Sequence, residues 1–132
     1  MPVDVASFFH AATSTWTHVT SDPATGAAAV IDPVLDFDPA SGRAGTEAAR
    51  AVLDHLRAQG LELKWILETH AHADHLTAAA WLRSQTGAPV AVGAGIVAVQ
   101  AEFKRRLALG AEFVADGSHF DRLLRDGERL PL

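Results

Sequence analysis

Three histidines and one aspartate occupy the stretch HAHADH at positions 70–75, and the whole chain has only seven histidines. Because the chain has no cysteine, a metal ion here would be held by imidazole and carboxylate groups. In an extended backbone His70 and His72 project to the same side, whereas in a helix they would lie roughly 200° apart and could not share an ion. The spacing therefore predicts a metal site at a strand end and loop, suited to zinc, iron(II) or manganese. The candidate ligands are His70, His72, Asp74 and His75.

An alternative interpretation gives the same residues a purely structural role. Aspartate is among the best N-cap residues, so Asp74 could begin a helix while the histidines face solvent. Capping and metal binding are compatible at Asp74, and the full His-x-His-x-Asp-His pattern at a strand-to-helix junction favours metal binding. His119, the only histidine after His75, lies in turn-like sequence and is interpreted as an ordinary surface or turn residue.

Two segments must position the histidine cluster. Residues 61–69, LELKWILET, predict a strand that leads directly into the cluster, and the residues from about Asp74 to Gly87 predict a helix that leaves it. A hairpin followed by strands that alternate with helices indicates a mixed α/β layered domain. The other expected elements are a strand at 14–21, its hairpin partner at 27–32, a long surface loop at 33–45, a helix at 46–59 between Thr46 as N-cap and Gly60 as stop, a strand at 88–93, a helix at 96–110 and the start of a strand at 128–132.

Composition excludes several classes of function. The 132 residues suit one domain, and the formal net charge of −5 gives no basic surface for nucleic acid or an anionic membrane. The N-terminal sequence lacks the basic and apolar regions of a signal peptide, and no uncharged apolar stretch reaches the ~20 residues of a membrane span. We therefore expect a soluble, cytoplasmic protein without nucleic-acid or membrane partners.

The sequence THAHADH resembles the metal motif of the metallo-β-lactamase fold superfamily. The stretches AAAVIDPVLDFDPASG, WILETHAHADHLTAAAWL, VGAGIVAVQAEFK and FVADGSHFDRLLRDGE are similar to one branch of it. That branch comprises persulfide dioxygenases and the β-lactamase hydrolase-like proteins, which neighbour the hydroxyacylglutathione hydrolases. The motif alone identifies the superfamily, whereas IDPVLDFD and GAGIVAVQ point to the branch. Together the similar stretches span nearly all of the chain.

The resemblance implies a role for each candidate residue, although no catalytic residue is assigned. His70 and His72 would occupy the first metal position, with His70 a direct iron ligand in dioxygenase-like members. Asp74 and His75 would serve a second metal position in dinuclear hydrolases, and would stand beside the metal in the mononuclear iron branch. Asp32 would hydrogen-bond the metal loop and fix its shape, or would cap the turn that follows it.

The resemblance also implies the fold and the limits of the site. The expected architecture is α/β, the first half of an αββα sandwich, with a mixed sheet and helices packed on one face. Residues 1–132 would form a single partial domain that lacks the C-terminal half and its later metal ligands. Fe(II) or Zn(II) would then be incompletely coordinated, and the isolated chain would be weakly active or inactive. An uncovered sheet face would favour a homo-oligomer.

Three functions follow as alternatives. The first is oxidation of a glutathione persulfide by an iron-dependent dioxygenase, an oxidoreductase. The second is zinc-dependent hydrolysis of a glutathione thioester, a hydrolase reaction on the same scaffold. The third is a non-catalytic module that self-associates or serves as a plain structural domain. The first two would take a glutathione-derived small molecule as substrate.

Overall fold

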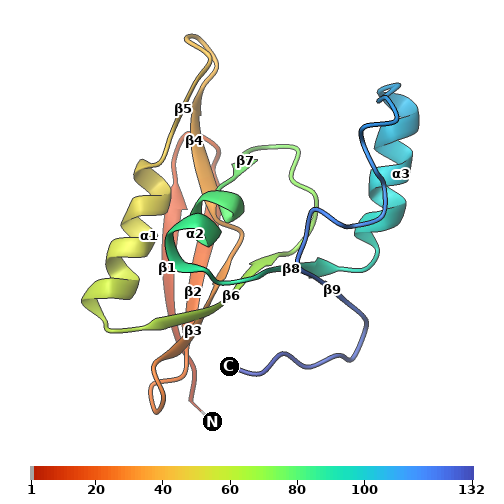
Figure 1. The fold of residues 1–132 in the computed structure, drawn as a ribbon. Helices are drawn as coiled ribbons and strands as arrows, with labels where there is room; N and C mark the ends of the chain where they lie inside the picture. The colour runs from red at the N-terminus through yellow and green to blue at the C-terminus, as the bar shows by residue number, and fades with distance from the viewer. Residues whose placement is uncertain (1) are drawn as a thin grey trace.

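The computed structural model describes residues 2–132, which form a mixed six-stranded sheet and a smaller three-stranded sheet (Figure 1). The six-stranded sheet has the order β1-β2-β3-β6-β8-β9, in which β1, β2 and β3 run antiparallel and the later neighbours pair in parallel. The three-stranded sheet has the order β5-β4-β7. The strands are β1 (Asp4–His10), β2 (Thr15–Ser21), β3 (Ala27–Ile31), β4 (Val34–Asp38), β5 (Arg43–Gly45), β6 (Glu62–Glu68), β7 (Leu76–Thr77), β8 (Val90–Gly93) and β9 (Arg122–Leu124).

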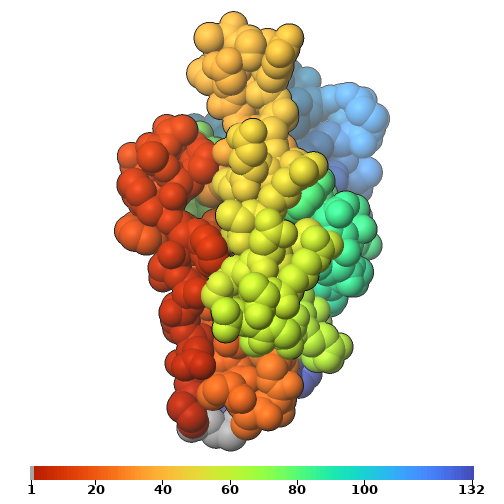
Figure 2. Space-filling view, turned by 90° about the vertical axis from the view of Figure 1, so that its left-hand side faces the viewer, coloured from red at the N-terminus to blue at the C-terminus, as the bar shows by residue number. Residues whose placement is uncertain are grey.

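Two of the three helices cover one face of the six-stranded sheet. They are α1 (Glu47–Ala58) and α2 (Ala79–Thr86), whereas α3 (Ile96–Arg106) stands apart from them beyond β8 and β9 (Figure 1). Figure 2 shows α1 lying over the molecule between β1 on one side and α2 on the other. This arrangement confirms the mixed α/β fold with helices packed on one face. None of the helices in residues 2–132 has both the length and the hydropathy needed to span a bilayer.

The core lies between that sheet face and the two helices. The apolar face of α1 is buried as its periodicity predicts, because residues three and four apart share one side of a helix. The central strands β2, β3, β6 and β8 contribute side chains that point toward the helices. The core consists of Val19, Ala28, Val30, Val52, Leu53, Leu56, Ile66, Ala79, Leu82, Ala88 and Val90.

Several boundaries differ from those expected from the sequence. Residues 33–45 were expected as a loop, and this prediction is wrong: β4 and β5 form an antiparallel hairpin there. The prolines and glycines of this segment lie at its ends and turn, so they interrupt the strand pattern without preventing pairing. β1 was not predicted at all. It pairs with β2 along its whole length, at the edge of the sheet.

The helix after the histidine cluster begins at Ala79 and not near Asp74. The short strand β7 intervenes and pairs with β4, which keeps residues 76–77 extended. Asp74 therefore caps no helix, and its carboxylate contacts His75 instead. At the C-terminal end, α3 stops at Arg106, short of the predicted Gly110, and residues 128–132 form no strand.

The N-terminus of α1 is capped from a distance by β4. Thr46 occupies the N-cap position but makes no capping hydrogen bond with its side chain. Instead, Asp36 Oδ2 accepts the Ala48 N–H at 2.8 Å, and Asp36 Oδ1 lies 3.0 Å from His10 Nε2. Partial burial acts to raise the pKa of Asp36, but the hydrogen bonds from Ala48 and His10 outweigh it and hold that pKa below its usual value.

Replacing Asp36 with Ala is expected to lower the free energy of unfolding by about 1–2 kcal/mol at pH 7, the usual cost of losing a helix cap. The folded-state pKa is lowered, so this stabilisation is present above the unfolded pKa of ~4 and is lost as the pH falls through the folded value. Urea titrations at pH 7 and pH 3 test both statements. Asp54→Ala, on the exposed side of α1, is the control. A difference between Asp36→Ala and wild type that persisted undiminished at pH 3 would contradict the prediction.

Candidate metal centre

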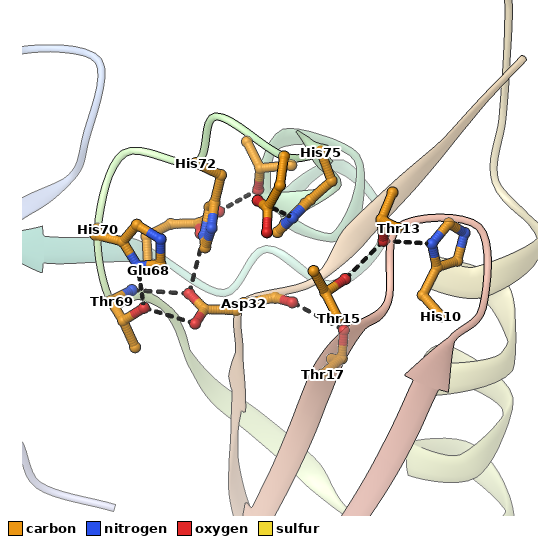
Figure 3. A network of polar contacts seen from close by, with 12 residues as sticks. His10, Thr13, Thr15, Thr17, Asp32, Glu68, Thr69, His70, His72 and His75 are labelled. Atoms are coloured by element: carbon orange, nitrogen blue, oxygen red, sulfur yellow. Dashed lines mark hydrogen bonds and ion pairs between the residues drawn. The ribbon is translucent and has the colours of Figure 1, made fainter. Parts of the chain in front are cut away.

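The histidine cluster lies where two parallel strands end. β3 ends at Ile31 and its parallel neighbour β6 ends at Glu68, so the residues that follow both strands meet at one edge of the sheet. Asp32 follows β3, and the loop of residues 69–75 follows β6. Asp32 has a backbone φ of +51°, a left-handed conformation that aspartate tolerates better than most residues. Figure 3 shows Asp32 directed at this loop.

The loop brings the candidate ligands together. The ring centroids of His70 and His72 are 4.3 Å apart, and those of His72 and His75 are 4.2 Å apart. Potential ligand atoms of Asp32, His70 and His72 lie within 4.8 Å of one another, and so do those of His72, Asp74 and His75. All of the residues singled out in the sequence are therefore neighbours in space, and their role as metal ligands remains a prediction.

His70 is oriented through Thr69, which the sequence did not single out. The Thr69 hydroxyl donates to Asp32 Oδ2 at 2.6 Å, and the Thr69 N–H donates to Asp32 Oδ1 at 2.8 Å. Because its hydrogen is used in this way, the Thr69 oxygen is the acceptor toward His70 Nδ1, 2.8 Å away. His70 Nδ1 then carries the ring proton, and its Nε2 keeps a lone pair.

His72 is held by two carboxylates. Its Nε2 lies 3.1 Å from Asp32 Oδ1 and 2.8 Å from Glu68 Oε2. A carboxylate is an acceptor, so Nε2 carries a proton, and in the neutral form of the ring Nδ1 is the nitrogen that keeps the lone pair. The side chain of His72 is only 6 % exposed, so these two contacts satisfy a nitrogen that water reaches poorly.

His75 supplies the observation that most favours a metal. Its Nδ1 lies 3.0 Å from Asp74 Oδ1, but its Nε2 is buried and has no hydrogen-bond partner within residues 2–132. Burial, followed by the charge of His72, lowers the pKa of His75, while Asp74 acts in the opposite direction. The neutral ring is favoured, and a neutral imidazole with a buried lone pair and no donor opposite it suits a cation.

Three imidazole nitrogens thus remain available for coordination in one loop. They are His70 Nε2, His72 Nδ1 and His75 Nε2. With the carboxylates they fall into two groups that share His72, and either group suits a divalent ion such as zinc or iron(II), because borderline metals accept imidazole together with carboxylate. His119 lies outside this set. It is exposed and contacts Gln100 at 3.2 Å, in keeping with the surface role expected of it.

Glu68 is a second residue that the sequence analysis missed. Burial raises the pKa of Glu68, and its hydrogen bonds from Thr77 and His72 act to lower it. A sequence signal was available, because Glu68 lies two residues after Ile66 and so shares the buried face of β6. A glutamate at a core position of a strand indicates a paired or functional carboxylate.

An apolar cavity of about 350 Å³ adjoins the histidines. Its far wall comes from α3 and from the segment that follows α3. Neither lysine nor arginine lines it, so histidines are the basic side chains in its wall. Besides Glu68, Leu76, Thr77 and the loop residues, its walls are formed by Ile96, Val99, Gln100, Phe103, Phe113 and Phe120.

The sequence of this chain is similar to those of several known proteins. Residues 19–131 match the metallo-beta-lactamase superfamily. A beta-lactamase hydrolase-like protein of Agrobacterium fabrum is 44 % identical over 97 % of this chain and 30 % of its own length. Glyoxylase B2 of Dictyostelium discoideum is 39 % identical over 84 % of this chain and 38 % of its own length. Human mitochondrial persulfide dioxygenase ETHE1 is 30 % identical over 63 % of this chain and 28 % of its own length.

Two solved structures extend the comparison. The crystal structure of ETHE1 from Myxococcus xanthus superimposes with a TM-score of 0.56 at 34 % identity, covering 67 % of this chain and 34 % of that chain. The BLEG-1 B3 metallo-beta-lactamase gives a TM-score of 0.64 at 21 % identity, covering 98 % of this chain and 56 % of that chain, which shows a shared fold. The chain thus spans well under two thirds of the length of these proteins. Its sequence match over residues 19–131 and its α/β fold show that it belongs to the metallo-β-lactamase superfamily.

Proposed function

We propose that the HAHADH loop is a divalent-metal centre and that this chain contributes it to a persulfide dioxygenase-like activity. The observation that carries the proposal is the buried Nε2 of His75, which has no hydrogen-bond partner within residues 2–132, in a loop where His72 shares one group of neighbouring ligand atoms with His75 and another with His70. His70 and His72 would hold Fe(II) or Zn(II). Asp74 and His75 would hold a second ion or would stand beside the first.

The residues of this chain would prepare the site in two ways. Asp32 fixes the imidazole protons of His70, through Thr69, and of His72 directly, so that the lone pairs are set before a metal arrives. The apolar cavity beside the histidines would exclude water from a bound substrate. Bound Fe(II) would supply activation of dioxygen for oxidising the sulfur of a glutathione persulfide.

Zinc-dependent hydrolysis of a glutathione thioester is a second candidate, favoured by the similarity to Glyoxylase B2. The two reactions differ in their need for oxygen. Oxygen uptake with glutathione persulfide supports the dioxygenase, whereas thioester cleavage under anaerobic conditions supports the hydrolase. A metal-loaded chain that turned over neither substrate would instead support a non-catalytic module.

Self-association is the property proposed for such a module. The outer face of β1 and β2 carries three large exposed side chains, those of Val5, Phe9 and Trp16. Phe9 and Trp16 are directly paired across the strands, with ring centroids 4.9 Å apart. A second copy could cover this apolar face. A mass above that of the monomer in light scattering supports the proposal, and a strictly monomeric mass at micromolar concentration overturns it.

Metal binding itself is tested by reconstitution. Chain loaded anaerobically with Fe(II) or with Zn(II), then desalted, is expected to retain metal in elemental analysis. His72→Ala is expected to lose most of it, because His72 belongs to both groups of neighbouring ligand atoms. His119→Ala, outside the cluster, is the control and is expected to retain it. An absence of metal from the wild-type chain would favour a structural domain.

A further inference from the structure

Glu68 occupies an unusual position for a carboxylate. It is the last residue of β6, its side chain is only 3 % exposed, and it points inward on the same face as Ile66. A carboxylate in such a place requires polar partners for its oxygens, since burial without them is costly. Glu68 has one for each oxygen. Oε2 lies 2.8 Å from His72 Nε2, and Oε1 accepts the hydroxyl of Thr77.

Thr77 ties this carboxylate to the start of α2. Because the Thr77 hydroxyl gives its hydrogen to Glu68, its oxygen is available as an acceptor. The backbone N–H of Ala79, the first residue of α2, donates to that oxygen at 3.0 Å. Glu68 is therefore fixed at two points, by the helix on one side and by the metal loop on the other. Figure 3 shows Glu68 and Asp32 approaching His72 together.

We propose that Glu68 is a positioning residue for the metal centre, acting through His72, an inference that rests on the proposed metal-binding function. With Asp32, it holds the proton of His72 on Nε2 and so leaves Nδ1 as the coordinating nitrogen. Its contact with Nε2, at 2.8 Å, is shorter than the 3.1 Å contact of Asp32. Glu68 is thus the nearer of the two partners and controls the orientation of the ring most directly.

Asp32 and Glu68 both lie against Nε2 of His72, and a divalent cation held by Nδ1 on the far side of the ring would favour the ionised form of both carboxyl groups. If Glu68 served only to accept the hydrogen bond from the Thr77 hydroxyl, a neutral acceptor would be sufficient. The two roles can be separated with Glu68→Gln, which keeps an acceptor oxygen but removes the charge, and Glu68→Leu, which removes both.

The first measurement concerns the His72 ring in metal-free protein. Long-range proton–nitrogen correlation spectra of ¹⁵N-histidine-labelled chain distinguish the two neutral tautomers. Wild type and Glu68→Gln are expected to show His72 protonated on Nε2. Glu68→Leu is expected to show a mixture, because Asp32 alone remains as acceptor. A purely structural role for Glu68 would leave the signature unchanged, so an unaltered tautomer in folded Glu68→Leu overturns the proposal.

The second measurement is the Zn²⁺ dissociation constant, by competition with a chromophoric chelator. Glu68→Leu is expected to bind Zn²⁺ about 10–100-fold more weakly than wild type, the usual effect of losing a partner of a metal-ligating histidine. Glu68→Gln is expected to fall between the two. Asp54→Asn, an equal charge change on the exposed side of α1, is expected to bind as wild type does.

The outcomes are distinct. If wild type binds Zn²⁺ and folded Glu68→Leu binds equally well, the inference about Glu68 fails while the metal centre stands. If wild type binds no Zn²⁺, the proposed function fails, and the tautomer spectra still decide the role of Glu68. If Glu68→Leu does not fold by circular dichroism, Glu68→Gln decides: affinity equal to that of Asp54→Asn overturns the proposal, and a several-fold loss supports it.

Discussion

Asp32→Asn is expected to weaken Zn²⁺ binding by about 10–100-fold, the effect typical of removing a carboxylate behind metal-ligating histidines. Asp32 is the residue on which both His70 and His72 depend. Its Oδ2 accepts the Thr69 hydroxyl that in turn orients His70, and its Oδ1 contacts His72 Nε2. One substitution therefore disturbs two of the three nitrogens available for coordination.

Asparagine is the informative replacement because it removes the negative charge and one acceptor oxygen while it keeps the shape of the side chain. Asp32 has a φ of +51°, which asparagine adopts at lower cost than alanine, so the substitution adds little backbone strain. The amide offers one acceptor oxygen where the carboxylate offered two. One of its contacts must therefore be lost, at a cost of about 1–3 kcal/mol for a hydrogen bond to a charged group.

The two effects are measured separately, as the Zn²⁺ dissociation constant and the free energy of unfolding of metal-free protein. Asp4→Asn, at the exposed start of the edge strand β1, makes the same charge change far from the loop and is expected to alter neither. Wild-type zinc affinity in folded Asp32→Asn would show that the histidine tautomers do not depend on Asp32.

The sequence identified the residues that gather in this loop better than it identified the residues that support them. The HAHADH spacing is local, so its consequence for metal binding follows from backbone geometry alone. Thr69, by contrast, acts only through Asp32, which lies 37 residues earlier and reaches it because β3 and β6 are parallel neighbours. The pairing of β3 with β6 depends on the packing of the whole sheet. The sequence around Thr69 therefore does not reveal that Thr69 contacts Asp32.

The fold was predictable to a similar degree. The helix at 46–59 was found because its apolar face repeats over three turns, a strong signal. The hairpin of β4 and β5 was missed because each strand is short and flanked by prolines or glycines, so it depends on its partners for stability. The start of α2 was placed too early because Asp74 resembles an N-cap, whereas its carboxylate is engaged with His75.

Leu82→Ala is expected to have the largest effect on stability, about 2–5 kcal/mol, the range for truncating a fully buried leucine. The side chain of Leu82 is completely buried in the core, in the cluster that joins α2 to the sheet. Its loss leaves a cavity that the rigid sheet cannot close, so the lost apolar transfer energy and the lost packing add. Urea denaturation of metal-free protein measures the change. Leu107→Ala, 63 % exposed just beyond α3, is the control and should cost little.

The Leu82→Ala variant also distinguishes the stability of the fold from the hydrogen bonding that orients the histidines of the metal loop. α2 is hydrogen-bonded toward the metal loop through the Ala79 N–H, which fixes Thr77 and thereby Glu68. Those contacts belong to the first turn of the helix and do not include Leu82. Where Leu82→Ala remains folded, its Zn²⁺ affinity is therefore expected to stay within about tenfold of wild type, less than the loss expected when a partner of a ligating histidine is removed. A larger loss of zinc affinity would mean that the packing of α2, and not the hydrogen bonds at its start, holds the histidines in place.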